Sequence, residues 1–327
     1  MAVVFGLCAG RAGAAVDARP ADADPWLRPA QVPAPESNAP TAERVELGKA
    51  LFFDPRLSGS NWISCASCHN PALGWSDGLP TGMGHGMKPL GRGTPTILNT
   101  AYNPLQMWDG RFKDLEQQAL GPMGSGAEMN QDLGSVATEF AAIAGYRARF
   151  DAAYPGESIS TTTIAKAIAS FERTVVSGEA PFDRWRRGDA AAIGASAQRG
   201  FELFKGKAEC GLCHMGWNFT DNGFHNIGLN SEDPGRYAQK PLKSMKGAFK
   251  TPTLRDVALT APYMHNGMYA SLEEVIEHYD RGGDLKDNLS PSIRPLGLTV
   301  VEKRDLLEFL KTLTGAPMLV VLPQLPQ

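Results

Sequence analysis

The chain has 327 residues, of which 43% are hydrophobic and 20% are charged, and its formal net charge is −3 at pH 7. This balance is ordinary for a globular protein, and it lacks the basic excess that predicts a nucleic-acid partner. Nothing approaches the roughly 18 consecutive apolar residues that a membrane-spanning helix requires. We therefore expect no nucleic-acid partner and no transmembrane segment, and the length allows two domains.

The first 42 residues predict no core of their own. Residues 1–20, "MAVVFGLCAGRAGAAVDARP", are apolar and then rich in small residues. They resemble the later part of a secretion leader without its positively charged opening. We interpret them as a residual leader that is removed together with Cys8, which predicts a periplasmic location. Residues 21–42 are rich in Pro, Ala and Asp and predict an extended arm.

Two Cys-x-x-Cys-His motifs carry the strongest signal in the chain. They are formed by Cys65, Cys68 and His69 and by Cys210, Cys213 and His214. A thioredoxin-type dithiol needs no following histidine, and zinc pairs stand about 15–20 residues apart rather than most of a domain apart. Covalent c-type haem explains every element, because each thiol adds to a vinyl group and the histidine binds the iron. We predict two covalent c-type haems with these histidines as proximal ligands.

The flanking segments predict that one helical unit occurs twice. "LGKALFFD" precedes the first motif and "RGFELFKG" the second, each with apolar residues at helical spacing. "TTTIAKAIASFERTVVSG" and "VEKRDLLEFLKTLTG" are expected to close the two units. No stretch shows a convincing run of alternating strands. We predict a mostly α fold with two cytochrome c-like domains, residues 43–185 and 186–327, each holding one haem.

With both motifs placed, the sequence resembles the bacterial di-haem cytochrome c peroxidase family, which includes MauG-like members. The resemblance extends from about Glu43 to Gly315 and is carried by "LGKALFFDPRLS", "CASCHNPALGWSDGLPTGMGHG", "RGTPTILNTAYNPLQMWDGRFKDLEQQALGP", "CGLCH" and "FKTPTLRDVALTAPYMHNGMYASLEEVIEHYDRGG". It implies a reaction with hydrogen peroxide in the N-terminal domain and electron transfer in the C-terminal domain.

The resemblance also assigns roles around the first haem. Peroxide cleavage needs an acid–base group near an open iron. The matching residue is Glu128, with Gln118 as a hydrogen-bonding neighbour and Pro122 shaping the pocket. The matching Trp108 lies between the two haems in the family and relays electrons. By composition alone Glu128 would be a solvated loop carboxylate and Trp108 a core aromatic.

Two further residues favour different members of the family. Ser271 and Glu274 form a capping box that predicts a helix with Tyr279 on its buried stripe, where a plain core tyrosine is the alternative. Tyr279 matches the position of a distal haem ligand that is methionine in cytochrome c peroxidases and tyrosine in MauG-like members; Met264 and Met268 are nearby competitors. His85 matches a histidine that caps the N-terminal haem of resting peroxidases.

The family also holds a calcium ion between its domains, partly through backbone carbonyls at positions matching Thr260 and Pro262. Calcium prefers such oxygen ligands. Gly93 stands where the family carries an asparagine, so one side-chain oxygen is missing. The predicted calcium site is therefore weaker than that of its relatives and would depend on water.

Three functions remain open from the sequence. The first is a peroxidase that takes electrons from a small cytochrome c or cupredoxin. The second is a MauG-like maturation enzyme that oxidises Trp or Tyr side chains of a specific partner protein. The third is a di-haem electron carrier without catalysis. His85 favours the first, Tyr279 favours the second, and the pocket pattern argues against the third.

Overall fold

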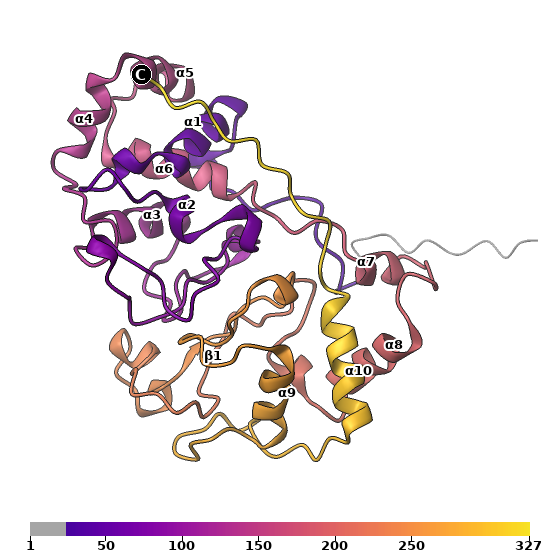
Figure 1. Cartoon of the computed structure of the whole chain (residues 1–327). Coiled ribbons are helices and arrows are strands. Elements are labelled where there is room, and N and C mark those ends of the chain that lie inside the picture. Colours follow the sequence, from indigo (N-terminus) through magenta and orange to yellow (C-terminus); the bar gives the residue numbers. More distant parts are fainter. Residues whose placement is uncertain (1–23) are drawn as a thin grey trace, which may run out of the picture.

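The computed structural model describes residues 24–327, so the predicted leader and the first three residues of the arm lie outside the described residues. Helices are the predominant regular elements, as expected from the sequence, and the named strands are two residues long (Figure 1). The α-helices are α1 Ala42–Phe53, α2 Cys65–Cys68, α3 Leu115–Gly124, α4 Val136–Ala142, α5 Ala144–Ala153, α6 Thr161–Glu172, α7 Pro181–Arg186, α8 Ala195–Lys205, α9 Leu272–Asp280 and α10 Val300–Lys311.

Single-turn 3-10 helices fill many of the connections between these elements. They are η2 Glu36–Asn38, η3 Pro55–Leu57, η4 Pro71–Leu73, η5 His85–Met87, η6 Thr100–Tyr102, η7 Cys210–Leu212, η8 Arg236–Ala238, η9 Lys243–Met245 and η10 Val257–Leu259. The strands β1 Phe224–His225 and β2 Phe249–Lys250 pair antiparallel. Outside its helices the described chain is therefore mostly loop, and the predicted site residues are divided between helices and loops.

The first half is built on the packing of α1 against α6. Thr41 caps α1 and Ser160 caps α6, each accepting a hydrogen bond from a main-chain N–H of the first turn. A Cβ added at Gly48 would lie 1.8 Å from the carbonyl oxygen of Ala167, so glycine permits the close approach of the two helices. Both helices were expected from the sequence.

The second half repeats this arrangement with α8 against α10. A Cβ added at Gly200 would lie 1.9 Å from the carbonyl oxygen of Asp305. Phe201, Phe204 and Phe309 are buried in one aromatic cluster at this crossing. In both halves, therefore, a glycine in the helix before the Cys-x-x-Cys-His motif lets the closing helix pack directly on its backbone.

Two hydrophobic clusters form the interior of the molecule. One includes buried residues from Leu47 to Val175, and the other includes buried residues from Phe182 to Leu313. The change from one cluster to the other falls just before the predicted boundary at residue 185. Cys65 packs against the first cluster and Cys210 against the second.

Each end of the described chain packs against the opposite half of the molecule: the start against the second half and the tail against the first. Near the start, Trp26 packs against Phe201 and Phe219 of the second cluster, with ring centroids 5.2 and 5.1 Å apart. The tail after α10 runs back along the first half and ends beside α5 (Figure 1). The described helices include none with the length and apolar character needed to cross a membrane.

Candidate haem sites

The two Cys-x-x-Cys-His motifs adopt closely similar turns. α2 contains both cysteines of the first motif, and the second motif begins with η7 at Cys210. In each, the main-chain N–H of the histidine donates to the carbonyl oxygen of the first cysteine, at 2.8 Å for His69 and 2.9 Å for His214. The four cysteines are not joined in disulfides. The local fold thus presents two thiols and one imidazole together at each motif.

Both histidines are oriented by a main-chain carbonyl. The Nδ1 atom of His69 lies 3.2 Å from the carbonyl oxygen of Trp75, and that of His214 lies 2.8 Å from the carbonyl oxygen of Phe219. Because a carbonyl can only accept, Nδ1 carries the proton and the Nε2 lone pair is left free for a metal. Second partners of this kind typically fix the ring of a metal-binding histidine.

Sequence reasoning missed these two orienting residues. Trp75 and Phe219 are buried, one in each hydrophobic cluster, and both have positive φ angles of 61° and 49°. Trp75 lies six residues after His69, and Phe219 lies five residues after His214. An aromatic residue at nearly the same distance from each motif is therefore the sequence feature that could have pointed to them. Burying the ring fixes the backbone whose carbonyl holds the imidazole.

Burial shifts the pKa of both motif histidines and of the Cys210 thiol toward the neutral form. It lowers the pKa of His69 and lowers that of His214 to about 4. It also raises the pKa of the Cys210 thiol to about 12, which differs from the depressed values of reactive dithiols. Neutral imidazoles with a free Nε2 and thiols beside them fit covalent haem better than a redox dithiol.

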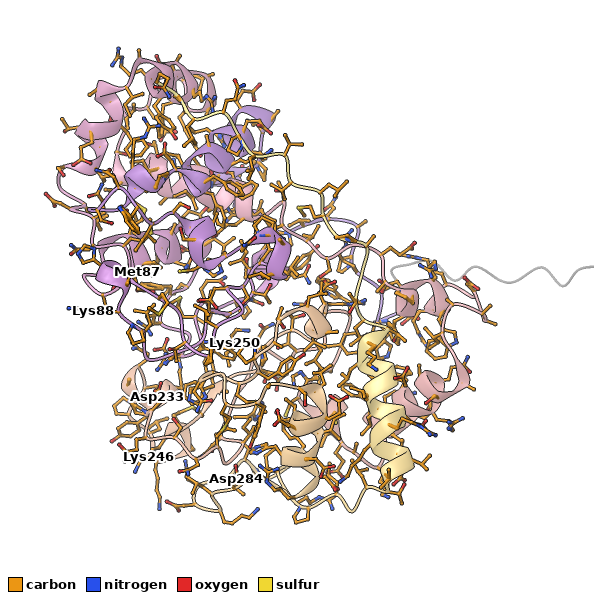
Figure 2. The ribbon with its side chains drawn as sticks, in the orientation of Figure 1. Met87, Lys88, Asp233, Lys246, Lys250 and Asp284 are labelled. Atoms are coloured by element: carbon orange, nitrogen blue, oxygen red, sulfur yellow. The ribbon has the colours of Figure 1, made fainter. Side chains whose placement is uncertain are left out.

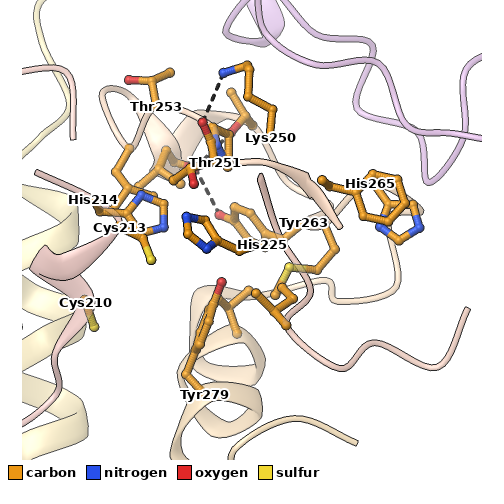
Figure 3. A pocket seen from close by; sticks show the side chains of 18 of the residues that line it. Cys210, Cys213, His214, His225, Lys250, Thr251, Thr253, Tyr263, His265 and Tyr279 are labelled. Atoms are coloured by element: carbon orange, nitrogen blue, oxygen red, sulfur yellow. Dashed lines mark hydrogen bonds between the residues drawn. The ribbon is translucent and has the colours of Figure 1, made fainter. Parts of the chain in front are cut away.

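A cavity of about 290 Å³ opens at the second motif. Its wall includes Cys210, Cys213 and His214 on one side and Tyr279 on another. Figure 3 shows the Tyr279 side chain rising from α9, its hydroxyl directed into the space beside these residues. Burial raises the pKa of the Tyr279 phenol, and the sulfurs of Cys210 and Cys213 in the same cavity wall raise it further.

Local sequence explains how α9 presents this tyrosine. The predicted capping box is present, with Ser271 accepting from the main-chain N–H of Glu274 at 3.2 Å. Leu272 and Ile276 are buried in the second cluster and fix the rotation of the helix. Of the two competing methionines, Met264 lines the cavity, whereas Met268 is 38% exposed and is not part of the wall.

Three further polar residues near this cavity, Asp221, His225 and Lys250, were not expected. Asp221, His225 and Cys213 place their ligand-type atoms within 4.8 Å of one another. The Cys213 sulfur and the Asp221 carboxylate, 2.8 Å from His225 Nε2, raise the pKa of His225 to about 9. Lys250 is only 8% exposed, and burial lowers its pKa to about 8. Only the tertiary fold unites these residues, so no single sequence motif marks them.

The residues predicted around the first haem gather near the first motif. Burial raises the pKa of the Cys68 thiol to about 11, and the carboxylates of Asp77 and Glu128 raise it further, so Glu128 lies within electrostatic reach of that sulfur. The main-chain N–H of His85 donates to the carbonyl oxygen of Ala127 at 2.9 Å. The loops that carry His85 and Glu128 are thus joined directly.

His85 has an unusual environment in this loop. Its Nδ1 atom is buried without a hydrogen-bond partner, and its Nε2 atom lies 3.4 Å from the Asn130 side-chain amide. Gly86 and Met87 beside it have positive φ angles. The imidazole is therefore weakly held by the described protein groups.

Gln118 and Pro122 both lie on α3, close to the Trp108 segment and the Glu128 loop respectively. The Gln118 amide points to the sulfur of Met107 at 3.9 Å, next to Trp108. The carbonyl oxygen of Pro122 accepts from the N–H of Met129 at 3.1 Å. Pro122 is within the helix, and Ser125 caps its end. The short helix α3 thus connects the Trp108 segment with the Glu128 loop.

Trp108 lies where the two halves of the molecule meet. Its indole N–H donates to the carbonyl oxygen of Gly93 at 2.9 Å, and its own carbonyl accepts from the N–H of Lys250 at 2.8 Å. It also lines the cavity at the second motif. Trp108 is therefore held from both halves rather than buried within one core.

The predicted calcium position offers few ligands. Thr260, Pro262 and Gly93 all line the same cavity. Both main-chain polar groups of Gly93 are already bonded, and a Cβ there would lie 2.9 Å from the carbonyl oxygen of Pro80. Calcium takes about six to eight oxygen ligands, so most would have to come from water. The residues present fit calcium poorly, and no function is derived from it.

Two Cys-x-x-Cys-His sites in a mostly helical fold define a c-type haem protein. A sequence model of the di-haem cytochrome c peroxidase family matches residues 42–191. The chain is 48% identical over 327 residues to the methylamine utilization protein MauG of Methylorubrum extorquens, covering 98% of this chain and 93% of that protein. It is 37% identical over 306 residues to cytochrome c551 peroxidase of Nitrosomonas europaea, covering 92% and 87%.

A solved structure agrees with these sequence relationships. The crystal structure of a MauG-like protein associated with microbial copper homeostasis matches with a TM-score of 0.82 and 34% identity, over 89% of this chain and 95% of that one. The chain belongs to the di-haem cytochrome c peroxidase family. It is therefore a haem-dependent oxidoreductase, as the sequence resemblance implied, and haem is its implied cofactor.

Proposed function

We propose that the protein reduces hydrogen peroxide at a haem held by the first motif and shares the oxidising equivalents with a haem held by the second. Cys65, Cys68 and His69 would hold the first haem, and Cys210, Cys213 and His214 the second. The haem irons supply the redox chemistry. The chain's own groups orient the proximal imidazoles, exclude water and move protons, with Glu128 as the acid–base group and Gln118 and Pro122 beside it.

The observation that carries this proposal is the pairing of His214 and Tyr279 across one cavity. Tyr279 approaches from α9, on a helix whose cap and buried side chains fix its direction. A phenolate is a hard ligand that favours higher iron oxidation states, unlike a thioether. The second haem would thus accept an oxidising equivalent more readily than a reducing electron. Trp108, bonded to both halves, would connect the two haems.

Tyr279 and the 48% identity to a protein named MauG favour a partner protein as the source of electrons. In this MauG-like reaction, Trp or Tyr side chains of a specific partner protein are oxidised. A protein of methylamine utilization is the first candidate partner to test. The periplasm is the proposed location, since covalent haem attachment of this kind occurs outside the cytoplasm. Membership of a peroxidase family favours catalysis over a simple electron carrier.

His85 supports a second candidate, a peroxidase that needs reductive activation. The joined loops hold His85 beside the Glu128 segment, and its buried Nδ1 lacks a protein partner. A weakly held imidazole next to the first haem could bind iron at rest and leave when the other haem is reduced. The electron donor would then be a small cytochrome c or cupredoxin.

One stopped-flow experiment separates the two candidates. The fully oxidised holoprotein is mixed with one equivalent of hydrogen peroxide, without a reductant, while its optical spectrum is followed. Immediate change of both haem spectra supports the shared, MauG-like reaction. A response only after pre-reduction of one haem supports the His85 gate. No reaction in either state would contradict both.

The same experiment tests the role of Glu128. The Glu128→Gln variant lacks the acid–base group but keeps the size of the side chain. We therefore expect it to react with hydrogen peroxide about 10²–10⁴ times more slowly than the wild type, with both haem spectra retained. Glu139→Gln, a carboxylate farther along the same domain, serves as the control. Unchanged kinetics in Glu128→Gln would remove Glu128 from the mechanism.

A further inference from the structure

The surface beside the second motif carries an unusual concentration of positive charge. Residues 236–250, "RYAQKPLKSMKGAFK", include five Lys or Arg and no Asp or Glu, in a chain whose formal net charge is −3. We name residues 236–246 the basic loop. Residues 237–244 form a continuous exposed run, with Tyr237 40% and Leu242 48% exposed.

The three lysines of the basic loop have uncompensated charges. Lys240, Lys243 and Lys246 are all exposed. The lysines that form ion pairs within residues 24–327 are Lys166, Lys205, Lys207, Lys303 and Lys311. Asp233, the nearest preceding aspartate, accepts hydrogen bonds from Arg92 Nε and Nη2 at 2.7 and 2.8 Å. The basic loop itself therefore carries Arg236 and three lysines without a carboxylate, and exposed Tyr237 and Leu242 lie between these charges.

The basic loop is anchored to the residues that connect the two haem sites. At its start, the Arg236 guanidinium donates to the carbonyl oxygens of Asp109 and Gly110, both at 2.7 Å. Just beyond its end, the N–H of Lys250 donates to the carbonyl oxygen of Trp108. Lys250 also lines the cavity at the second motif. Figure 2 shows Lys246 at the outer edge of this half and Lys250 further inside.

We propose that the basic loop is the docking surface for an acidic partner protein that supplies electrons to this enzyme. Charged faces of opposite sign steer association, and the apolar side chains between them give contact area. The rest of the molecule is net negative and repels such a partner, which directs it to this face. This proposal rests on the proposed function and adds the chemistry of the partner and its place of contact.

The electron balance requires such a partner. Reduction of one hydrogen peroxide to two waters consumes two electrons and two protons. Both candidate functions take those electrons from a protein, either a small redox donor or an aromatic substrate protein. A partner on the basic loop would lie against the backbone that continues into Trp108 and into the wall of the second cavity.

The test uses a reduced, acidic cupredoxin as the probe and the peroxide-oxidised holoprotein. The bimolecular rate of cupredoxin oxidation is followed by stopped flow from about 10 mM to about 500 mM salt, where screening becomes nearly complete. The variant combines Lys240→Glu, Lys243→Glu and Lys246→Glu. The control combines Arg147→Glu, Arg304→Glu and Lys311→Glu, which gives the same charge change on exposed faces of α5 and α10.

At low salt we expect the loop variant to oxidise cupredoxin at least about 10-fold more slowly than the wild type, and the control variant to stay within about 2-fold of it. The wild-type rate should decrease as salt is added, whereas the rate of the loop variant should not. Equal losses in both variants, or no loss in either, would overturn the proposal. The proposal would also be overturned if these lysines bound the protein to anionic phosphatidylglycerol vesicles while the loop variant oxidised cupredoxin at the wild-type rate. Peroxide mixed with each protein alone reports the proposed function separately, because that reaction needs no partner.

Discussion

Trp75 and Phe219 show how single residues prepare the two haem sites. Each buries its ring in one hydrophobic cluster and turns its carbonyl toward the Nδ1 of a motif histidine. The imidazoles are thereby fixed in one tautomer before any metal is bound. Within residues 24–327 the Tyr279 hydroxyl forms no hydrogen bond, and it faces the cavity directly.

Tyr279→Phe should change the optical spectrum of one haem and leave the other unchanged. Removing the hydroxyl removes the proposed distal ligand while keeping the buried ring, so the fold should be retained. The reduction potential of that haem should also rise, because a hard oxygen ligand favours the ferric state. Tyr263→Phe is the control, since Tyr263 lines the same cavity but donates to the carbonyl oxygen of Val257. Equal spectra for wild type and Tyr279→Phe would exclude Tyr279 as a ligand.

Glu172 gives a prediction about pH. It is 4% exposed at the end of α6, and burial raises its pKa from 4.5 to about 8. Below about pH 4.5 the carboxyl is protonated whether the chain is folded or unfolded. Between about pH 4.5 and 8 the folded state binds the proton more tightly, so its stability falls as pH rises through this window.

Glu172→Gln should abolish most of this pH dependence, because the amide does not titrate. The free energy of unfolding of the holoprotein, measured in urea from pH 5 to 9, should fall with pH by up to ~4 kcal/mol in the wild type and much less in the variant. Glu157→Gln, on an exposed carboxylate, should behave as the wild type. Parallel curves for the wild type and Glu172→Gln would contradict the prediction.

At the scale of elements, the molecule repeats one helix crossing. α1 approaches α6 at Gly48, and α8 approaches α10 at Gly200, in each case with carbonyl oxygens where a Cβ would stand. The repeat was visible in the sequence as a glycine within the apolar pattern before each motif. The helix crossing itself was not visible in the sequence, because it depends on which later helix packs against that glycine.

Gly200→Ala should therefore destabilise the second half. The new methyl group would meet the carbonyl oxygen of Asp305 at 1.9 Å and force the two helices apart, at a cost of about 1–3 kcal/mol. Gly194→Ala is the matched control, since a Cβ at Gly194 meets nothing within 4 Å. Thermal unfolding of both holoproteins checks this, and equal melting temperatures would show that α8 and α10 can separate without loss.

At the scale of the whole molecule, the two halves are tied by their ends and by a polar interface. Asn99 is fully buried and its amide donates to Ser177 at 2.8 Å and to Asn218 at 3.1 Å, which links the halves. The tail after α10 returns to the first half, where Met318 and Val320 pack against its hydrophobic cluster. These contacts join the two halves at their interface and through the C-terminal tail.

Removal of residues 317–327 should loosen the first half selectively. The tail carbonyls of Gln324 and Pro326 accept hydrogen bonds from Arg149 and Arg56 at 3.0 and 2.9 Å, and these would be lost. Hydrogen exchange should increase in α1 and α5 and remain unchanged in α9. Leu319→Asp, at a position 91% exposed, is the control that should have no effect. Faster exchange spread evenly over both halves would contradict this assignment.

From the sequence we could predict the helical class, the two haem motifs, the family and the capping box of the Tyr279 helix. These are local features, because the motif spacing, the apolar periodicity and the cap residues all act within a few turns of chain. Family resemblance supplied the roles proposed for Glu128, Trp108 and His85.

Tertiary structure decided the rest. His225 and Lys250 join the second cavity from the paired strands β1 and β2, and Trp75 acts through its main-chain carbonyl, which only the folded backbone brings to His69. The position of the basic loop against the Trp108 segment depends on hydrogen bonds between residues more than 120 positions apart. Such contacts arise only when the whole chain folds, since burial and charge pairing are set by distant neighbours rather than by local sequence.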